Sequence, residues 1–394
     1  MPGFRQANEM NFRGINGPGL ATAILIGSLG TAALGMEPVM LSAMVQDGRI
    51  SEATVGALVT TELLAIAMGT IVGTRLLSRF PAPVVGIVAA VLTAASNALA
   101  IGRSGNLALI ALRGLAGLVE GVLMALSLVA ISRASAPERA SGLFLAAQTF
   151  IQLIAITVAS NLRLFGSGTD ACLAILAGCG LAAAFVSLIA PRHLDPPKSE
   201  TGGGGLTVRD MTGLVAVGAF TGATICVWGY LGLWFAHHAF PAAIASKAVA
   251  ISLFAQIMGA LSAARFGRRL SPRPTILAAT LLTSLVILQM KQAQHNMITF
   301  YALSAAFSFL WLFTLPAFAG LLVEIDPTRR ALLYIAAFQL AGAASLPLLA
   351  GVAIGYGGIA GVFYLSIGVL CLAMALVVTL RGATPGMGAE DLHG

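Results

Sequence analysis

Long apolar runs alternate with short polar breaks along almost the whole chain. A helix that crosses about 30 Å of hydrocarbon needs roughly 17–25 apolar residues, and twelve runs fall in or above that range. They lie at residues 20–46, 51–77, 83–102, 106–131, 140–162, 170–190, 211–236, 242–264, 274–290, 297–323, 331–354 and 359–381. The pattern predicts an all-α polytopic membrane protein with twelve transmembrane helices.

The longest polar break divides these runs into two sets of six. Residues 191–210 contain Pro196, Pro197 and a run of four glycines, a composition that stays flexible. We therefore predict an N-terminal six-helix bundle at 1–190, a cytoplasmic linker at 191–210, a C-terminal six-helix bundle at 211–381 and a cytoplasmic tail at 382–394.

The composition fits a chain whose surroundings are mostly lipid. Of its 394 residues, 58% are hydrophobic and 9% are charged, which leaves too few polar groups to cover a water-soluble surface. The formal charge of +7 comes from basic residues that stand singly between apolar runs, so we expect no nucleic-acid-binding face. The four cysteines lie inside apolar runs without disulfide or zinc spacing, and we expect no metal and no cofactor.

Lysine and arginine are distributed unequally between alternate polar breaks. Of the 22, 16 fall on the side of the N-terminus, five fall on the other side, and Arg113 lies within an apolar run. Because loops rich in Lys and Arg stay on the cytoplasmic side, we expect both termini and the linker in the cytoplasm. The expected location is a bacterial-type inner membrane, which the chain crosses many times.

Two short motifs resemble signatures of the major facilitator superfamily of transporters. The loop after span 8 reads Arg265-Phe-Gly-Arg-Arg269, with Ala264 where that signature usually has an aspartate. Span 4 carries an arginine followed by two glycines at intervals of four, Arg113, Gly117 and Gly121. The resemblance implies two six-helix bundles, related by pseudo-twofold symmetry, that move a small solute by alternating access.

The resemblance also implies roles for these motifs. The span-4 arginine is associated with proton coupling in the superfamily. The basic loop is expected to act in gating or structure, by holding the cytoplasmic ends of neighbouring helices together in one state, through Arg265, Gly267, Arg268 and Arg269. The alternative for the loop is that its charges only set the topology.

Four charged residues stand inside apolar runs, where each costs roughly 2.5–3.5 kcal/mol on insertion scales unless it faces a partner or water. They are Glu37, Glu62, Arg113 and Glu120. Arg113 and Glu120 are about two helical turns apart and therefore share one face of span 4. We predict that Glu37 or Glu120, coupled to Arg113, takes up and releases a proton. The alternative is a permanent ion pair that braces the helices.

The two other glutamates differ in their surroundings. Glu37 precedes Pro38 in span 1, where the proline frees a backbone carbonyl and can kink or break the helix. We expect Glu37 in the central cavity, which span 1 lines in the superfamily; the alternative is a residue near the outer boundary that reaches water. Glu62 lies near the middle of span 2, and we expect it to have a structural or gating role.

Amide and aromatic side chains inside the apolar runs are candidates for substrate binding. Amides can hydrogen-bond a polar solute but also bridge helices in lipid, and aromatic rings can stack on a solute or pack between helices. Both interpretations stay open for the seven candidates, which are Gln148, Gln152, Trp228, Tyr230, Gln256, Trp311 and Gln339.

The motifs of membrane-embedded enzymes are missing. The sequence has no His-Glu-x-x-His helix, no Gly-x-Ser-x-Gly elbow and no Walker loop, so we expect no enzyme. We expect a secondary active transporter coupled to protons. Its partners would be a small-molecule substrate, protons and membrane lipids, and the chain would act as a monomer.

The direction of transport is indicated by an absence in span 5. Drug:proton antiporters of the superfamily usually carry Gly-x-x-x-Gly-Pro-x-x-Gly-Gly there, and this chain does not. Uptake by symport is therefore favoured over multidrug or metabolite efflux by antiport. A channel or a non-transporting receptor is a further alternative.

Overall fold

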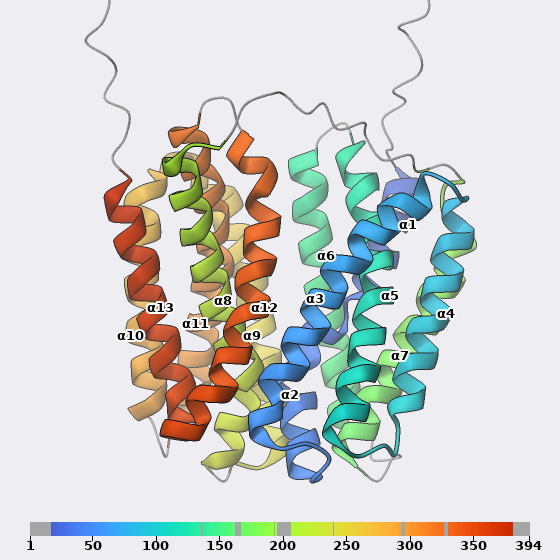
Figure 1. Cartoon of the computed structure of the whole chain (residues 1–394), viewed down its shortest axis with the longest axis horizontal. Helices are drawn as coiled ribbons and strands as arrows, with labels where there is room; N and C mark the ends of the chain where they lie inside the picture. Colours follow the sequence, from blue (N-terminus) through green and yellow to red (C-terminus); the bar gives the residue numbers. More distant parts are fainter. Residues whose placement is uncertain are drawn as a thin grey trace, which may run out of the picture. The chain divides into compact units, whose positions relative to one another are not determined.

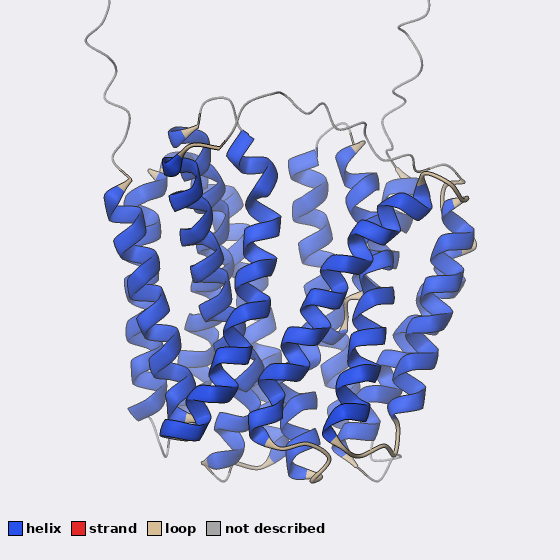
Figure 2. Cartoon of the chain, viewed as in Figure 1, coloured by secondary structure: helices blue, strands red, loops and turns tan. Residues whose placement is uncertain are grey.

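The computed structural model describes residues 17–134, 137–161, 167–192, 194, 206–238, 240–292, 296–326 and 330–380. Within these residues the chain is helical, and no strand is present (Figures 1 and 2). The elements are α1 (Pro18–Gly30), α2 (Ala33–Gln46), α3 (Glu52–Leu77), α4 (Ala82–Ala100), α5 (Asn106–Ser132), α6 (Pro137–Asn161), α7 (Gly168–Ser187), α8 (Val208–His237), α9 (Ala242–Phe266), the short 3-10 helix η2 (Gly267–Arg269), α10 (Pro272–Gln292), α11 (Met297–Ile325), α12 (Arg330–Gly357) and α13 (Ala360–Thr379).

Twelve helical segments in this part of the chain are long and apolar enough to cross a membrane. Each coincides with one predicted apolar run to within a few residues, and α1 and α2 together make the first span, Pro18–Gln46. The prediction of twelve transmembrane helices is confirmed. The protein is a multi-pass membrane protein.

The first span is broken near its middle. Helix α1 ends at Gly30 and α2 begins at Ala33, with Thr31 and Ala32 in a turn between them. Pro38, the residue expected to disturb this span, lies inside α2 instead. A helix tolerates an internal proline in a membrane when neighbouring groups satisfy the carbonyl that it frees.

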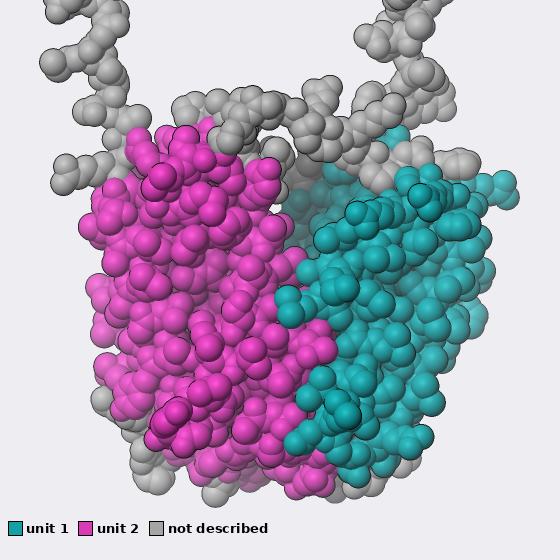
Figure 3. All heavy atoms as spheres, in the orientation of Figure 1, with its two compact units in different colours: residues 1–36, 64–201 teal, residues 37–63, 202–394 magenta. Residues whose placement is uncertain are grey.

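The described helices pack into two compact units (Figure 3). Unit 1 comprises residues 1–36 and 64–201, and unit 2 comprises residues 37–63 and 202–394. Segment 37–63, which is the second part of span 1 and the first part of span 2, therefore packs with the last six spans. The predicted bundle limits remain a prediction, because the linker at 191–210 is described only in part and the tail at 382–394 lies outside the described residues.

In unit 1, helix α5 packs against α1 and α4, and α4 packs against α7. The packing of α3 on α5 explains why the span-4 motif has a glycine at position 121. Gly121 of α5 lies against the carbonyl of Ile66, and Gly69 of α3 lies against the carbonyl of Leu118, so a Cβ atom would clash with backbone at either glycine. Small residues of this kind let helix backbones approach closely in a membrane.

In unit 2, helix α8 packs against α12 and α13, while α11 packs against α9 and α10. The contact between α8 and α12 is again made through backbone. Gly218 and Gly222 of α8 lie against the carbonyls of Phe338 and Gly342 of α12. Helix α8 is therefore enclosed by protein along most of its length, and its side chains are held in fixed positions.

Candidate functional site

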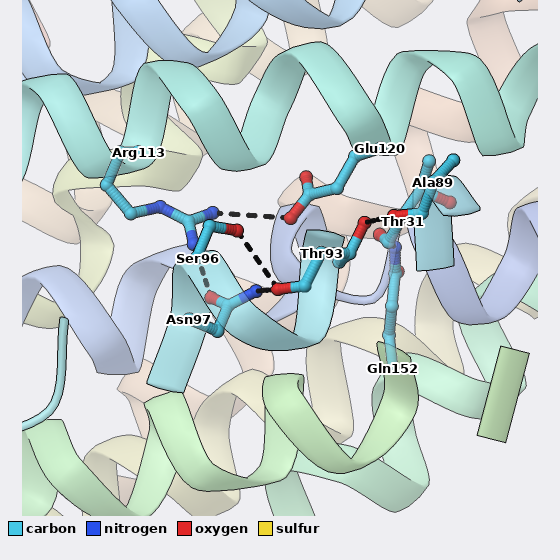
Figure 4. A network of polar contacts seen from close by, with 8 residues as sticks. All are labelled: Thr31, Ala89, Thr93, Ser96, Asn97, Arg113, Glu120 and Gln152. Carbon is cyan, nitrogen blue, oxygen red and sulfur yellow. Dashed lines mark hydrogen bonds and ion pairs between the residues drawn. The ribbon is translucent and has the colours of Figure 1, made fainter. Parts of the chain in front are cut away.

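The two charged residues of span 4 lie together inside unit 1. Arg113 and Glu120 project from one face of α5, and each is only 1% exposed. The Arg113 Nη2 and Glu120 Oε1 atoms are 3.8 Å apart (Figure 4). This distance is longer than the roughly 2.7–2.9 Å of a charge-assisted hydrogen bond. The predicted pairing on one helix face is confirmed as a buried but loose ion pair.

A third side chain, Asn97 of α4, holds the arginine. Arg113 Nη1 donates a hydrogen bond of 2.8 Å to Asn97 Oδ1, and Asn97 Nδ2 donates to the Thr93 carbonyl at 2.9 Å (Figure 4). The Ser96 hydroxyl donates to the same carbonyl at 3.0 Å. The guanidinium is thus anchored more closely to a neutral amide than to the carboxylate.

Sequence analysis missed Asn97, although a signal was present. Asn97 is an amide inside an apolar run, as Gln148 and Gln152 are, and it is 1% exposed. The same reasoning on buried polar groups in lipid applies to it. Helical periodicity within the sequence could not indicate the partner of Asn97, because Arg113 lies on another helix.

Gln148 and Gln152 of α6 lie at the break in span 1. Gln148 Nε2 donates to Thr31 Oγ1 at 2.8 Å, and Gln152 Nε2 donates to the Thr31 carbonyl at 3.2 Å. The Thr31 hydroxyl in turn donates to the Gly27 carbonyl at 2.8 Å. In a membrane, backbone groups outside regular helix need internal partners. Gln152 supplies one for the Thr31 carbonyl, and Gln148 bonds to the Thr31 side chain. The structure therefore shows the two glutamines as partners of the broken helix.

Glu37 and Glu62 are as deeply buried as the pair on α5. Glu37 in α2 is 1% exposed and Glu62 in α3 is fully buried. Both belong to unit 2, whereas Arg113 and Glu120 belong to unit 1. The three residues predicted to couple protons are thus divided between the two units.

The two deep tryptophans meet inside unit 2. The rings of Trp228 on α8 and Trp311 on α11 have centroids 6.1 Å apart and planes tilted by 56°. Tyr230 is two residues from Trp228 and points to the opposite side of α8, where its hydroxyl lies beside Gly56 of α3. Of the predicted aromatic candidates, the structure brings together the tryptophans and sets the tyrosine apart.

Several buried polar atoms on α9 and α11 have no hydrogen-bond partner among the described residues. They are the Trp311 indole nitrogen and the hydroxyls of Ser304 and Ser308 on α11, and the hydroxyl of Ser252 on α9. Their spacing puts Ser304, Ser308 and Trp311 on one face of α11, and α9 packs along this helix. Gln256, one turn after Ser252, is buried, while Gln339 of α12 is half-buried.

The basic loop after span 8 is exposed. Arg265 is in the last turn of α9, and Gly267 and Arg269 belong to η2. A Cβ atom at Gly267 would meet no neighbour, so packing in this structure does not require the glycine. The side chain of Arg268 lies outside the described part of the chain. Among the described residues, no cluster of three or more His, Cys, Asp or Glu could hold a metal ion.

Comparison with solved structures identifies the fold. The chain is similar to a mutant of the nucleoside transporter NupG, with a TM-score of 0.71 at 13% identity over 92% of this chain and 98% of that one. It is also similar to a D-xylose-proton symporter, with a TM-score of 0.69 at 15% identity over 92% and 97% of the two chains. The chain has the major facilitator fold. A bacterial homologue of the human lysosomal transporter Spinster shares this fold, with a TM-score of 0.65 at 14% identity over 93% and 98%.

The major facilitator fold confirms the resemblance drawn from the Arg113 motif and the loop Arg265–Arg269. No protein-family model matches the chain, and no curated protein does. A fold of this kind serves many solutes, so the function has to be argued from the residues of the two units.

Proposed function

We propose that the chain is a secondary active transporter that moves a small organic solute across the inner membrane by alternating access, in symport with protons. The observation that carries this proposal is the buried Arg113–Glu120 pair, in which Asn97 holds the arginine independently of the carboxylate. An arginine anchored to a neutral amide keeps its place when the carboxylate accepts a proton. A pair of this kind can switch, whereas a bracing ion pair depends on both charges.

Glu120 is the proposed proton carrier. A carboxylate beside a cation is stabilised in its charged form, and the same carboxylate in apolar surroundings is stabilised in its neutral form. A change of conformation that lengthens the 3.8 Å contact to Arg113 would favour proton uptake, and one that restores the contact would favour release. Glu37 is proposed as a second carrier, since it is a buried carboxylate in unit 2.

The solute is proposed to bind in unit 2, at Trp228 and Trp311. Two aromatic faces and a set of unpartnered donors suit a small neutral molecule with one flat or apolar face and several hydrogen-bond acceptors. The named solutes of two similar structures, a nucleoside and D-xylose, have this character. Tyr230, Gln256, Gln339, Gln148 and Gln152 remain proposed contributors in states in which their present neighbours separate.

The proposed orientation puts both termini in the cytoplasm, because most Lys and Arg residues lie on that side. In this orientation the exposed residues Arg265 and Arg269 lie at the cytoplasmic ends of the helices. We propose a gating or structural role for them together with Gly267 and Arg268, and a similar role for Glu62. The chain is proposed to work as a monomer.

The decisive experiment compares gradient-driven accumulation with exchange in proteoliposomes. Thermal-shift screening of sugars and nucleosides on the purified protein would supply the solute. Glu120→Gln imitates a permanently protonated residue, so we expect it to abolish accumulation driven by a pH gradient while solute exchange continues. Glu62→Gln makes the same substitution at a buried glutamate of α3. A gating or structural role for Glu62 predicts that this variant changes driven accumulation and exchange together and does not separate them.

Three outcomes would overturn the proposal or one of its parts. Undiminished driven accumulation in Glu120→Gln would exclude this residue as the proton carrier. Flux that neither saturates nor responds to a proton gradient would exclude a coupled carrier and point to a channel. Accumulation driven only when the gradient is reversed would show an exporter with the same coupling residue.

A further inference from the structure

A second pair of titratable residues lies far along the chain from the Arg113 network. Glu52 is the first residue of α3 and His237 is the last residue of α8. The His237 Nε2 and Glu52 Oε1 atoms are 2.6 Å apart, with 43% and 32% of the side chains exposed. Both residues belong to unit 2. The pair therefore joins the start of span 2 to the end of span 7 at a place that water can reach.

Each partner sits at the helix end that favours its charge. The amino end of a helix stabilises a negative side chain and the carboxyl end stabilises a positive one. Glu52 is in the first turn of α3 and His237 is in the last turn of α8. When the imidazole is protonated, the contact is a short ion pair supported by both helix ends. When the imidazole is neutral, a single hydrogen bond remains.

The pair borders a contact that is otherwise made largely by backbone. Gly56 of α3 lies against the carbonyl of Pro347, and Gly232 of α8 lies against the carbonyl of Pro38. The Thr60 hydroxyl donates to the Ala344 carbonyl at 2.5 Å. These surfaces fit closely without interlocking side chains. The Glu52–His237 pair adds an ionic contact between α3 and α8, which must break when these two helices separate.

We infer that Glu52 and His237 form a proton-sensitive latch that holds segment 37–63 against α8. In the proposed orientation this latch lies on the outer side, because α8 begins after the cytoplasmic linker and ends at His237. An imidazole changes charge between about pH 5 and 8. The ion pair exists while the imidazole is charged, and the latch weakens when the imidazole becomes neutral as the pH rises. A proton arriving from outside thus favours closure, as uptake by symport requires.

The surroundings add charges of both signs. Towards the same ends of the elements around this contact, the described ionisable residues include Asp47, Arg49, Tyr230, His238, Lys247, Tyr301 and Tyr356, and the buried Glu37 and Glu62 lie further along α2 and α3. The neighbouring His238 differs from His237 in its contacts, since its Nδ1 atom lies 2.9 Å from the Trp234 carbonyl of its own helix. It is a matched control for the substitution of His237.

The test is the rate at which a buried position behind the latch becomes accessible. Val55, one turn after Glu52, is fully buried, and Val55→Cys in the full-length protein can be labelled with an impermeant maleimide. The labelling rate of the parent chain, which has four cysteines of its own but not Val55→Cys, is subtracted from each measured rate. At each pH the rate in a latch variant is divided by the rate in Val55→Cys alone, which cancels the effect of pH on thiol reactivity.

For His237→Gln and for Glu52→Gln, we expect a rate ratio of roughly three to ten at pH 5.5, the range expected for an exposed ion pair supported by helix ends. The ratio for His237→Gln should fall toward one at pH 8.5. His237→Arg keeps a permanent charge and should label more slowly than the reference at pH 8.5, while His238→Gln should give the same ratio at both pH values.

A ratio of one at both pH values for His237→Gln and Glu52→Gln would overturn the latch. A raised ratio that is independent of pH would overturn its proton dependence. Slow labelling of His237→Arg at pH 8.5 confirms that this variant is folded and that charge is the cause. No solute is needed, so failure here is separate from failure of proton coupling at Glu120.

Discussion

In unit 1 the buried polar side chains mostly bond to one another or to helix carbonyls, whereas in unit 2 several have no partner among the described residues. Arg113 and Asn97 form part of a continuous network in unit 1. In unit 2 the Ser304 and Ser308 hydroxyls and the Trp311 indole nitrogen are buried without a bond. An unsatisfied polar group is costly in a membrane, and a bound solute is the partner that we propose for these groups. We propose that the Arg113–Glu120 pair of unit 1 is the main charge-handling site and that Trp228 and Trp311 of unit 2 make the main solute contacts.

The largest expected effect comes from removing first one charge and then both charges of the Arg113–Glu120 pair in unit 1. Arg113→Gln leaves Glu120 buried without its cation, and breaking a buried pair in this way typically costs about 3–5 kcal/mol. The double variant Arg113→Gln, Glu120→Gln should recover part of that loss, because no isolated charge remains. The free energy of unfolding in detergent, measured for the three variants and the parent, checks this. Equal losses in the single and double variants would show that the two side chains are not coupled.

Asn97 is expected to have the next largest effect. A buried hydrogen bond to a charged group contributes about 1.5–3 kcal/mol, and Asn97→Leu removes the one from Arg113 Nη1. The guanidinium then loses its hydrogen bond to a neutral amide, so we expect its position to depend more on Glu120 and solute accumulation to lose its normal dependence on pH while the solute KM is retained. The pH profile of driven uptake measures this. A profile identical to that of the parent would contradict a positioning role for Asn97.

The sequence predicted the features that depend on residues close together in the chain. Span positions follow from runs of apolar residues, and the Arg113–Glu120 pairing follows from helical periodicity. The contacts of Asn97, of Thr31 and of Glu52 were not predictable, since their partners lie on other helices. The glutamines of α6 were predicted as candidates for substrate binding, with helix bridging as the alternative. Their role at the broken helix could not be inferred, because the break falls at Thr31 rather than at Pro38.

In unit 2, the comparable test removes one hydrogen-bond donor, the indole N–H of Trp311, from the Trp228–Trp311 pair. Trp311→Phe keeps an aromatic ring beside Trp228 but removes the indole N–H, which has no partner among the described residues. If the solute accepts this hydrogen bond, its affinity should fall by about 1–1.5 kcal/mol, or roughly tenfold. Solute counterflow at increasing concentrations gives the KM, and the response to a pH gradient should be unchanged. A normal KM with impaired coupling would reverse the roles assigned to the two units.

The smallest expected effect comes from two serines that differ in their bonding. The Ser127 hydroxyl of α5 donates to the Ala23 carbonyl at 2.5 Å, while the Ser308 hydroxyl of α11 has no partner within the described structure. Ser127→Ala should therefore lower the free energy of unfolding by about 1 kcal/mol, and Ser308→Ala should leave it unchanged or raise it slightly, because an unsatisfied group is removed. Thermal unfolding in detergent without solute measures both. If Ser308→Ala is as destabilising as Ser127→Ala, the Ser308 hydroxyl is already satisfied in the solute-free protein, and the contrast between the units does not extend to this position. If Ser308→Ala leaves the free energy of unfolding unchanged but weakens solute binding, the Ser308 hydroxyl forms a hydrogen bond with the solute.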